Sequence, residues 1–172
     1  MNLFTASELF EVKEIDNQAF PLNLEFEIKT QNTNNFKGPG IYFLYYKNEL
    51  VYIGSFFKSV HKNDVRIQRW TKELATISMR GWQTTMNSTS NKALDNSINL
   101  RNIARKPKGD FQTSKKRIEF ADLNWNEFSA NNFLKDFTFH WFPEEKNLAR
   151  SKKQLEILTK QLREFYKPSC NG

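Results

Sequence analysis

The chain has 172 residues, a formal net charge of +7, a mean hydropathy of −0.70 and a single cysteine, Cys170. This length predicts one domain with a sizeable core. One cysteine excludes an internal disulfide framework and a zinc site built from several cysteines. The sequence has no apolar run of the ~20 residues that cross a bilayer and no secretory signal, so we expect a protein of the reducing cytoplasm that does not enter a membrane. The basic balance favours anionic partners, with nucleic acid ahead of acidic lipid.

The first third of the chain predicts a helix, a strand and a turn. Residues 5–15 are typical of a short helix capped by Thr5 or Ser7. Residues 22–29 alternate between apolar and polar side chains, which predicts a half-buried strand. Residues 37–40, Lys-Gly-Pro-Gly, predict a turn that leads into the next strand.

A β-hairpin is predicted next. The unbroken apolar run over 41–46 is typical of a central strand buried on both faces. Residues 47–49 leave room only for a hairpin turn before the second apolar run, 50–54. A tight hairpin places these two runs side by side, so we expect Tyr42 and Tyr52 to lie near each other.

The rest of the chain alternates between predicted helices and strands. A helix over 64–78 is expected after a cap at Asn63 or Asp64, and a modest helix over 91–104 follows. The apolar positions of the first of these helices are Val65, Ile67, Trp70, Leu74 and Ile77. Strands are expected at Arg117–Phe120 and 136–142, while 125–134 is ambiguous, and a final helix is expected over 145–165. Together these elements predict an α+β fold in which a small antiparallel central sheet is flanked by helices.

A basic arm is the most uneven feature of the charge distribution. Between residues 101 and 117 one acid, Asp110, is outnumbered by seven cations: Arg101, Arg105, Lys106, Lys108, Lys115, Lys116 and Arg117. A charge run of this kind is commonly a solvated loop, but the motifs described below favour contacts with DNA phosphates. We expect residues 1–172 to form a single domain in which 79–135 is a basic helix-and-loop insertion for DNA recognition.

The predicted hairpin carries two tripeptides, Gly40-Ile41-Tyr42 and Tyr52-Ile53-Gly54. A GIY triplet, a short spacer and a YIG triplet resemble the signature of the GIY-YIG nuclease superfamily. The resemblance implies that Tyr42 and Tyr52 line a cutting site and that one of them takes the proton from the attacking water. An ordinary phenol has a pKa of about 10, so it needs a neighbouring cation or metal to lower that pKa before it can act as a base.

The family also places a phosphate-neutralising arginine early in the helix after YIG, a role that suits a guanidinium fork. Here Arg66 and Arg69 compete for that position, with Arg69 preferred, because the loop before them is longer than the family's. Lys58 and His61 lie in this loop, where the resemblance allows either to assist the base or the leaving group.

The resemblance implies a metal-binding glutamate on a later helix, followed by an asparagine. Glu156 and Asn171 match these positions, with a separation typical of the homing enzymes. Mg²⁺ (or Mn²⁺) is the expected cofactor, because a hard cation takes oxygen ligands and keeps several waters.

The function implied is Mg²⁺-dependent cleavage of double-stranded DNA. Ser55 replaces a lysine of the repair nucleases, and this departure argues against the excision-repair branch. We expect no linker and no appended domain, so a type II restriction endonuclease is the leading interpretation, and two coordinated cuts favour a homodimer. The alternatives are a structure-selective, mobile-element or repair nuclease, or a non-catalytic DNA-binding module on the same fold.

Overall fold

The computed structural model describes residues 2–16, 20–21, 23–29, 34–57, 64–81, 115–145 and 150–171. The chain forms two compact units. The first comprises Met1–Phe10, Ile28–Trp70 and Leu134–Asn171, and the second comprises Glu11–Glu27, Thr71–Phe133 and Gly172. No helix among the described residues has the length and apolarity needed to span a bilayer.

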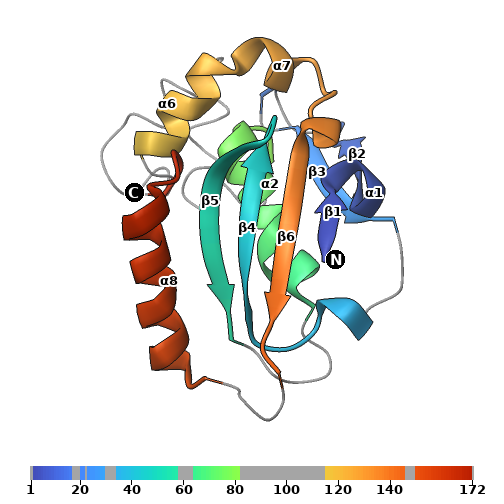
Figure 1. The fold of residues 1–172 in the computed structure, drawn as a ribbon. Coiled ribbons are helices and arrows are strands. Elements are labelled where there is room, and N and C mark those ends of the chain that lie inside the picture. Colours follow the sequence, from blue (N-terminus) through green and yellow to red (C-terminus); the bar gives the residue numbers. More distant parts are fainter. Residues whose placement is uncertain are drawn as a thin grey trace, which may run out of the picture. The chain divides into compact units, whose positions relative to one another are not determined.

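The first unit contains an antiparallel four-stranded sheet in the order β1-β6-β4-β5 (Figure 1). Its elements are β1 (Leu3–Thr5), α1 (Ala6–Leu9), the 3₁₀ turn Asn34–Phe36, β4 (Gly40–Tyr46), β5 (Glu49–Phe56), the π-helical turn Arg66–Trp70, the 3₁₀ turn Leu134–Asp136, β6 (Phe137–Pro143) and α8 (Lys152–Tyr166). The predicted α+β class with a small antiparallel sheet flanked by helices is confirmed.

The β4–β5 hairpin is the predicted one. Lys47 and Asn48 form its turn with φ of 48° and 67°, the left-handed backbone that a tight hairpin requires. β4 lies between β5 and β6 and is mostly buried, as the apolar run predicted. β5 lies at the edge of the sheet, so one side of its backbone needs partners other than a strand.

The two faces of this sheet are covered by different elements. α8 packs on the face that carries Ile41 and Ile53, where Leu155 is fully buried against them. Figure 1 shows α8 running alongside β5 at the border of the sheet. On the opposite face the Trp70 ring stacks on Phe139, with 4.3 Å between ring centroids.

The second unit contains a two-stranded sheet and several helices. β2 (Phe10–Glu14) pairs with β3 (Leu24–Ile28), and the helices are α2 (Thr71–Ser78), α6 (Lys115–Leu123) and α7 (Trp125–Ser129). Arg80 is 1% exposed and contacts several segments of this unit that are distant in sequence. It donates hydrogen bonds to the carbonyls of Pro21 and Phe128, each 2.7 Å away, and to the side-chain oxygens of Asn23 and Asn131.

Several predicted elements need correction. The expected strand at Arg117–Phe120 is wrong: these residues lie in α6, where Ile118 and Ala121, three positions apart, are buried. The helix expected over 5–15 is a single turn, α1, after which β2 begins at Phe10.

Other boundaries shift by a few residues. The final helix begins after Ser151, whose hydroxyl accepts the Gln154 N–H at 3.2 Å, rather than at Glu145. β5 extends through Ser55 and Phe56, which were expected in the following loop. The ambiguous stretch contains α7, and the helix expected over 91–104 lies outside the described residues.

Candidate functional site at the edge of strand β5

The hairpin register brings the two signature tyrosines together. Tyr42 pairs with Gly54, and Tyr52 pairs with Leu44, so both tyrosines lie on the sheet face opposite α8. Their ring centroids are 6.1 Å apart. Tyr42 is 1% exposed, whereas Tyr52 is partly exposed. Of the pair, therefore, Tyr52 is the phenol that solvent and a substrate can reach.

Gly54 has a specific role beneath the Tyr42 ring. A Cβ atom at this position would lie 2.3 Å from Cζ and 2.4 Å from the hydroxyl oxygen of Tyr42. The ring therefore lies directly against the bare glycine backbone. A larger residue at position 54 would therefore force the Tyr42 ring to move.

The C-terminal segment completes the edge of β5. The Asn171 side chain accepts the N–H of Ile53 at 2.8 Å and donates to the carbonyl of the same residue at 3.1 Å. The Cys170 N–H donates to the carbonyl of Val51 at 2.7 Å. Asn171 thus substitutes for a neighbouring strand at Ile53 of β5, the residue directly after Tyr52 in the chain. Asn171 therefore contacts the strand that carries Tyr52, and its catalytic role stays a prediction.

Arg163 also reaches this peptide. Its Nε donates to the Ile53 carbonyl at 2.8 Å, and its guanidinium carbon lies 5.5 Å from the centre of the Tyr52 ring. A cation is therefore held beside the accessible tyrosine. The sequence interpretation missed Arg163, and the signal that could have found it is its place seven residues after Glu156, on the same side of a helix.

Glu156, the predicted metal ligand, is exposed on α8. Its side chain is 59% exposed, and its carboxylate lies 3.9 Å from the Lys152 ammonium. Seven residues separate Glu156 from Arg163, which places them about 20° apart around the helix and about 10.5 Å apart along it. Because Arg163 contacts the edge of β5, Glu156 lies on the side of α8 that borders the same edge.

Arg66 is committed to an internal ion pair. Its side chain is 1% exposed and donates to both carboxylate oxygens of Asp64 at distances from 2.6 to 3.1 Å. Asp64 also accepts the Arg66 backbone N–H at 2.8 Å, which confirms Asp64 as a cap of the predicted helix. The guanidinium carbon lies 4.1 Å from the centre of the Phe36 ring. This environment leaves Arg66 little surface for a phosphate.

Arg69 is exposed and lies in the π turn with which the helix begins. A π turn is wider than an α turn and changes which positions face inward. As a result Ile67, predicted to be buried, is 54% exposed, and Arg66 is buried instead. Of the two competing arginines, Arg69 is the one that a substrate can reach.

The remaining predicted residues fall in three groups. Lys58, His61, Arg101, Arg105, Lys106 and Lys108 lie outside the described residues, as does the side chain of Lys115. Lys116 is exposed on α6. Arg117 forms an ion pair with Glu73 at 2.6 Å and donates to the Thr76 hydroxyl, so part of its fork is occupied within the second unit.

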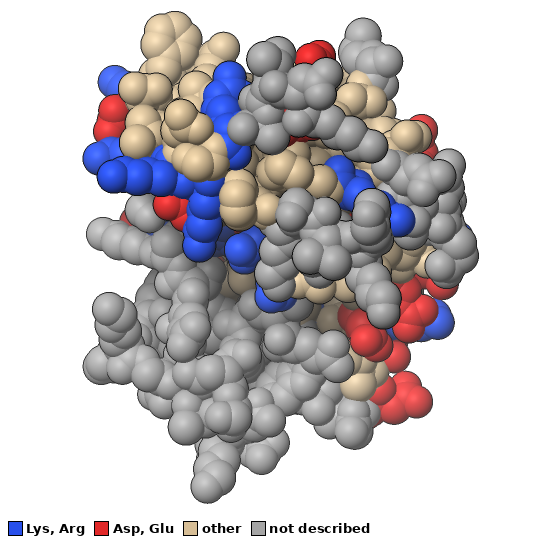
Figure 2. Space-filling model, turned by 90° about the horizontal axis from the view of Figure 1, so that it is seen from below, with Lys and Arg blue, Asp and Glu red and all other residues tan. Residues whose placement is uncertain are grey.

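A second basic segment lies within the described residues. Six lysines and arginines but only two glutamates occur from Arg150 to Lys167, a density that the sequence analysis did not single out. In Figure 2 basic side chains gather toward the side on which α8 lies in Figure 1. An anionic partner approaching α8 therefore meets mainly positive charge.

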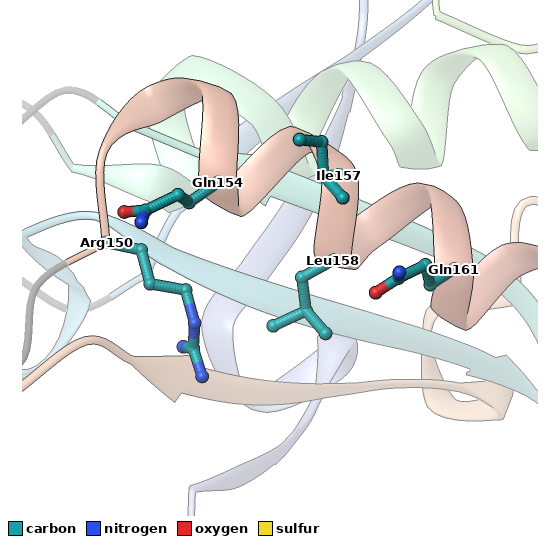
Figure 3. A pocket seen from close by; sticks show the side chains of 5 residues that line it. All are labelled: Arg150, Gln154, Ile157, Leu158 and Gln161. Atoms are coloured by element: carbon teal, nitrogen blue, oxygen red, sulfur yellow. The ribbon is translucent and has the colours of Figure 1, made fainter.

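A groove of about 300 Å³ runs along α8, lined by Arg150, Gln154, Ile157, Leu158 and Gln161 (Figure 3). Its one charged residue, Arg150, is bonded to Glu144 at 2.5 Å. The lining offers no carboxylate, imidazole or phenol for acid–base chemistry. The groups that can perform such chemistry lie at the β5 edge instead.

The described residues contain no group of three or more histidine, cysteine, aspartate or glutamate side chains that could hold a metal. Glu156 offers an exposed carboxylate on the side of α8 that borders the β5 edge. This donor fits Mg²⁺, which is commonly bound through one or two carboxylates, with waters and substrate phosphates completing its shell.

Comparison with known proteins adds no further constraint, because the chain matches no family model, no curated protein and no solved structure.

Proposed function

We propose that the chain is an endonuclease that hydrolyses phosphodiester bonds of double-stranded DNA at the β5 edge. The observation that carries this proposal is the convergence of Tyr52, Arg163 and Asn171 on one strand edge, with Glu156 on the bordering side of α8. These are the group types that the reaction needs: a proton acceptor, a cation for the phosphate and a carboxylate for a metal. The basic surface of α8 supports an anionic polymer as substrate.

In the proposed reaction Tyr52 accepts a proton from the attacking water. A guanidinium beside a phenol favours the phenolate, so the position of Arg163 over the Tyr52 ring suits this role. Asn171 holds the backbone of Ile53 in place. Tyr42 packs on Gly54 and lies next to the Tyr52 ring, which it helps to position. Tyr42 is therefore a positioning residue in this proposal.

Glu156 would hold the divalent cation, and Arg69 supplies an exposed guanidinium for the DNA backbone. When bound, Mg²⁺ or Mn²⁺ would neutralise charge on the phosphate and stabilise the leaving oxygen. The chain's own residues would position the phosphate, orient water and accept its proton.

The test is cleavage of plasmid and long linear DNA with Mg²⁺ or with EDTA. Discrete fragments that require Mg²⁺ are expected from a restriction endonuclease, and a smear would indicate a nonspecific or structure-selective nuclease. DNA binding without cleavage under Mg²⁺ or Mn²⁺ would overturn the enzymatic proposal.

A matched pair of variants tests the carboxylate. Glu156→Gln should abolish cleavage and keep DNA binding, because the metal ligand is lost while the charge on the surface becomes more positive. Glu164→Gln is the control, since Glu164 forms the same kind of ion pair with Lys160, also at 3.9 Å, on the same helix. Equal cleavage by both variants would show that Glu156 holds no essential metal.

A second candidate function is a non-catalytic DNA-binding module. Two observations favour it: Tyr42 is buried, and Arg66 is occupied by Asp64, so two of the predicted catalytic groups serve the fold. This candidate predicts a salt-sensitive gel shift and no cleavage under any divalent metal.

For the restriction-enzyme form of the proposal we infer a homodimer, because two coordinated cuts in a duplex call for two copies of the site. Sedimentation equilibrium of the free protein and of its DNA complex tests this inference. A single chain per duplex that still cuts both strands would contradict it.

A further inference from the structure

We propose that Arg163 on α8, rather than Arg66, contacts the phosphate next to Tyr52. This inference rests on the proposed function, since it names the residue that binds the phosphate at the same site. It concerns one side chain and one kind of ligand, the phosphodiester group of nucleic acid.

The guanidinium of Arg163 is anchored through one of its three nitrogens. Arg163 is partly exposed, and its Nε donates to the Ile53 carbonyl at 2.8 Å. Within the described part of the chain, its two terminal NH₂ groups make no hydrogen bond and no ion pair. A guanidinium anchored through Nε and open at its two terminal nitrogens is oriented for the two-pronged contact that arginine makes with a phosphate.

The backbone that anchors Arg163 is itself held in place by Asn171. Asn171 bonds both polar groups of Ile53, the residue that holds Arg163, and Tyr52 directly precedes Ile53 in the chain. Arg163 and Tyr52 are therefore positioned from one short piece of backbone. A cation held so close to the accessible phenol would place a bound phosphate within reach of the water that Tyr52 activates.

Arg163 differs in its surroundings from Arg66, one of the two arginines that the family resemblance offered for the phosphate. Arg66 is 1% exposed and bonded to both oxygens of Asp64. Moving it to a phosphate would leave the 3% exposed carboxylate of Asp64 uncompensated, which is costly. Arg163 needs no such exchange, because no acid is paired with it among the described residues.

The experiment compares Arg163→Gln with Lys135→Gln, which removes an exposed cation that lies outside α8 and outside the basic arm. DNA binding is measured in EDTA by fluorescence anisotropy at several salt concentrations, and cleavage is measured in Mg²⁺. Arg163→Gln should reduce the slope of log K against log salt by about 0.9, the change expected for one phosphate contact. It should also slow cleavage by about 100-fold. Lys135→Gln should keep both values near those of the wild type.

Thermal melting shows whether each variant is folded. If Arg163→Gln does not fold, the inference is tested on the wild-type protein by following the NMR resonance of the Arg163 Nε–H. Addition of a short DNA duplex in EDTA should shift that resonance, and an unshifted resonance in the bound protein would overturn the inference.

The two proposals fail in different ways. A folded Arg163→Gln variant with the wild-type salt slope and cleavage rate would overturn the role of Arg163 and leave the nuclease proposal standing. A reduced salt slope in a protein that never cuts DNA would support the phosphate contact and remove the nuclease proposal.

Discussion

Arg80 in the second unit and Arg163 in the first both donate to backbone carbonyls, yet their surroundings differ. Arg80 is 1% exposed and has four acceptors, two carbonyls and two asparagine side chains. Burial lowers its pKa to about 10, with nearby Glu14 acting in the opposite direction. Arg163 has one acceptor, an aromatic ring beside it, and terminal nitrogens that face no described acceptor.

The difference separates an arginine that holds a fold together from one that is available to a ligand. A buried guanidinium held by several internal acceptors is costly to disturb, whereas an anchored guanidinium with open donors can bind an anion without breaking an internal contact. By this criterion Arg66 belongs with Arg80, because it is buried and paired with the carboxylate of Asp64, whereas Arg69 is exposed.

The largest effect is expected at Asp64. Asp64→Ala leaves the buried guanidinium of Arg66 without its carboxylate and should lower the free energy of unfolding by about 3–5 kcal/mol. Urea denaturation measures this loss. A variant as stable as the wild type would show that Arg66 can turn toward solvent, and would remove the reason for setting it aside as a phosphate ligand.

Arg80→Leu should destabilise the protein by about 3 kcal/mol, because it leaves buried acceptors without donors. The matched change Arg163→Leu should cost only about 1 kcal/mol, since one hydrogen bond is lost at a partly exposed site. Equal losses in urea denaturation would remove the distinction between the two arginines.

Gly54→Ala tests the support beneath the tyrosine pair. The new methyl group would lie 2.3 Å from Tyr42 Cζ, so the ring must move, at an expected cost of about 1–3 kcal/mol. Cleavage should fall with it, because Tyr42 and Tyr52 are adjacent. Ser55→Ala, one residue further along β5, is the control and should leave melting temperature and cleavage nearly unchanged.

Asn171→Ala should cost about 1 kcal/mol, because the edge peptide of β5 exchanges its side-chain partner for water. Amide hydrogen exchange at Ile53 should accelerate, since its N–H loses the 2.8 Å bond to Asn171. Unchanged exchange at this amide would show that Asn171 does not hold the peptide that positions Arg163.

The smallest effect concerns His140 on β6. Burial lowers its pKa below the usual 6.5, so the unfolded chain binds a proton first as the pH falls. The contribution of His140 to stability is therefore present above pH 6.5 and is lost as the pH falls through the folded-state pKa. His140→Gln should flatten this dependence slightly, and NMR titration of the imidazole checks the direction. A pKa at or above 6.5 would contradict it.

The sequence by itself determined the local elements that repeat a simple pattern. The apolar runs around Lys47 and Asn48 specified the hairpin, and the register that follows from it brought Tyr42 and Tyr52 together. The final helix was predicted, although it begins at Lys152 and not at Glu145, and Asp64 was one of the two residues predicted to cap the helix over 64–78. In each case the information lies in residues close in the chain.

Tertiary structure decided which polar side chains are available. The π turn buried Arg66 and exposed Ile67, against the α-helical periodicity. Arg163 meets Ile53, 110 residues away in the sequence, only because α8 packs on β5. A local pattern records which residues share a helix face, but it does not record which carbonyl or carboxylate a distant segment presents. Which arginine lies beside Tyr52 is therefore a property of the folded chain.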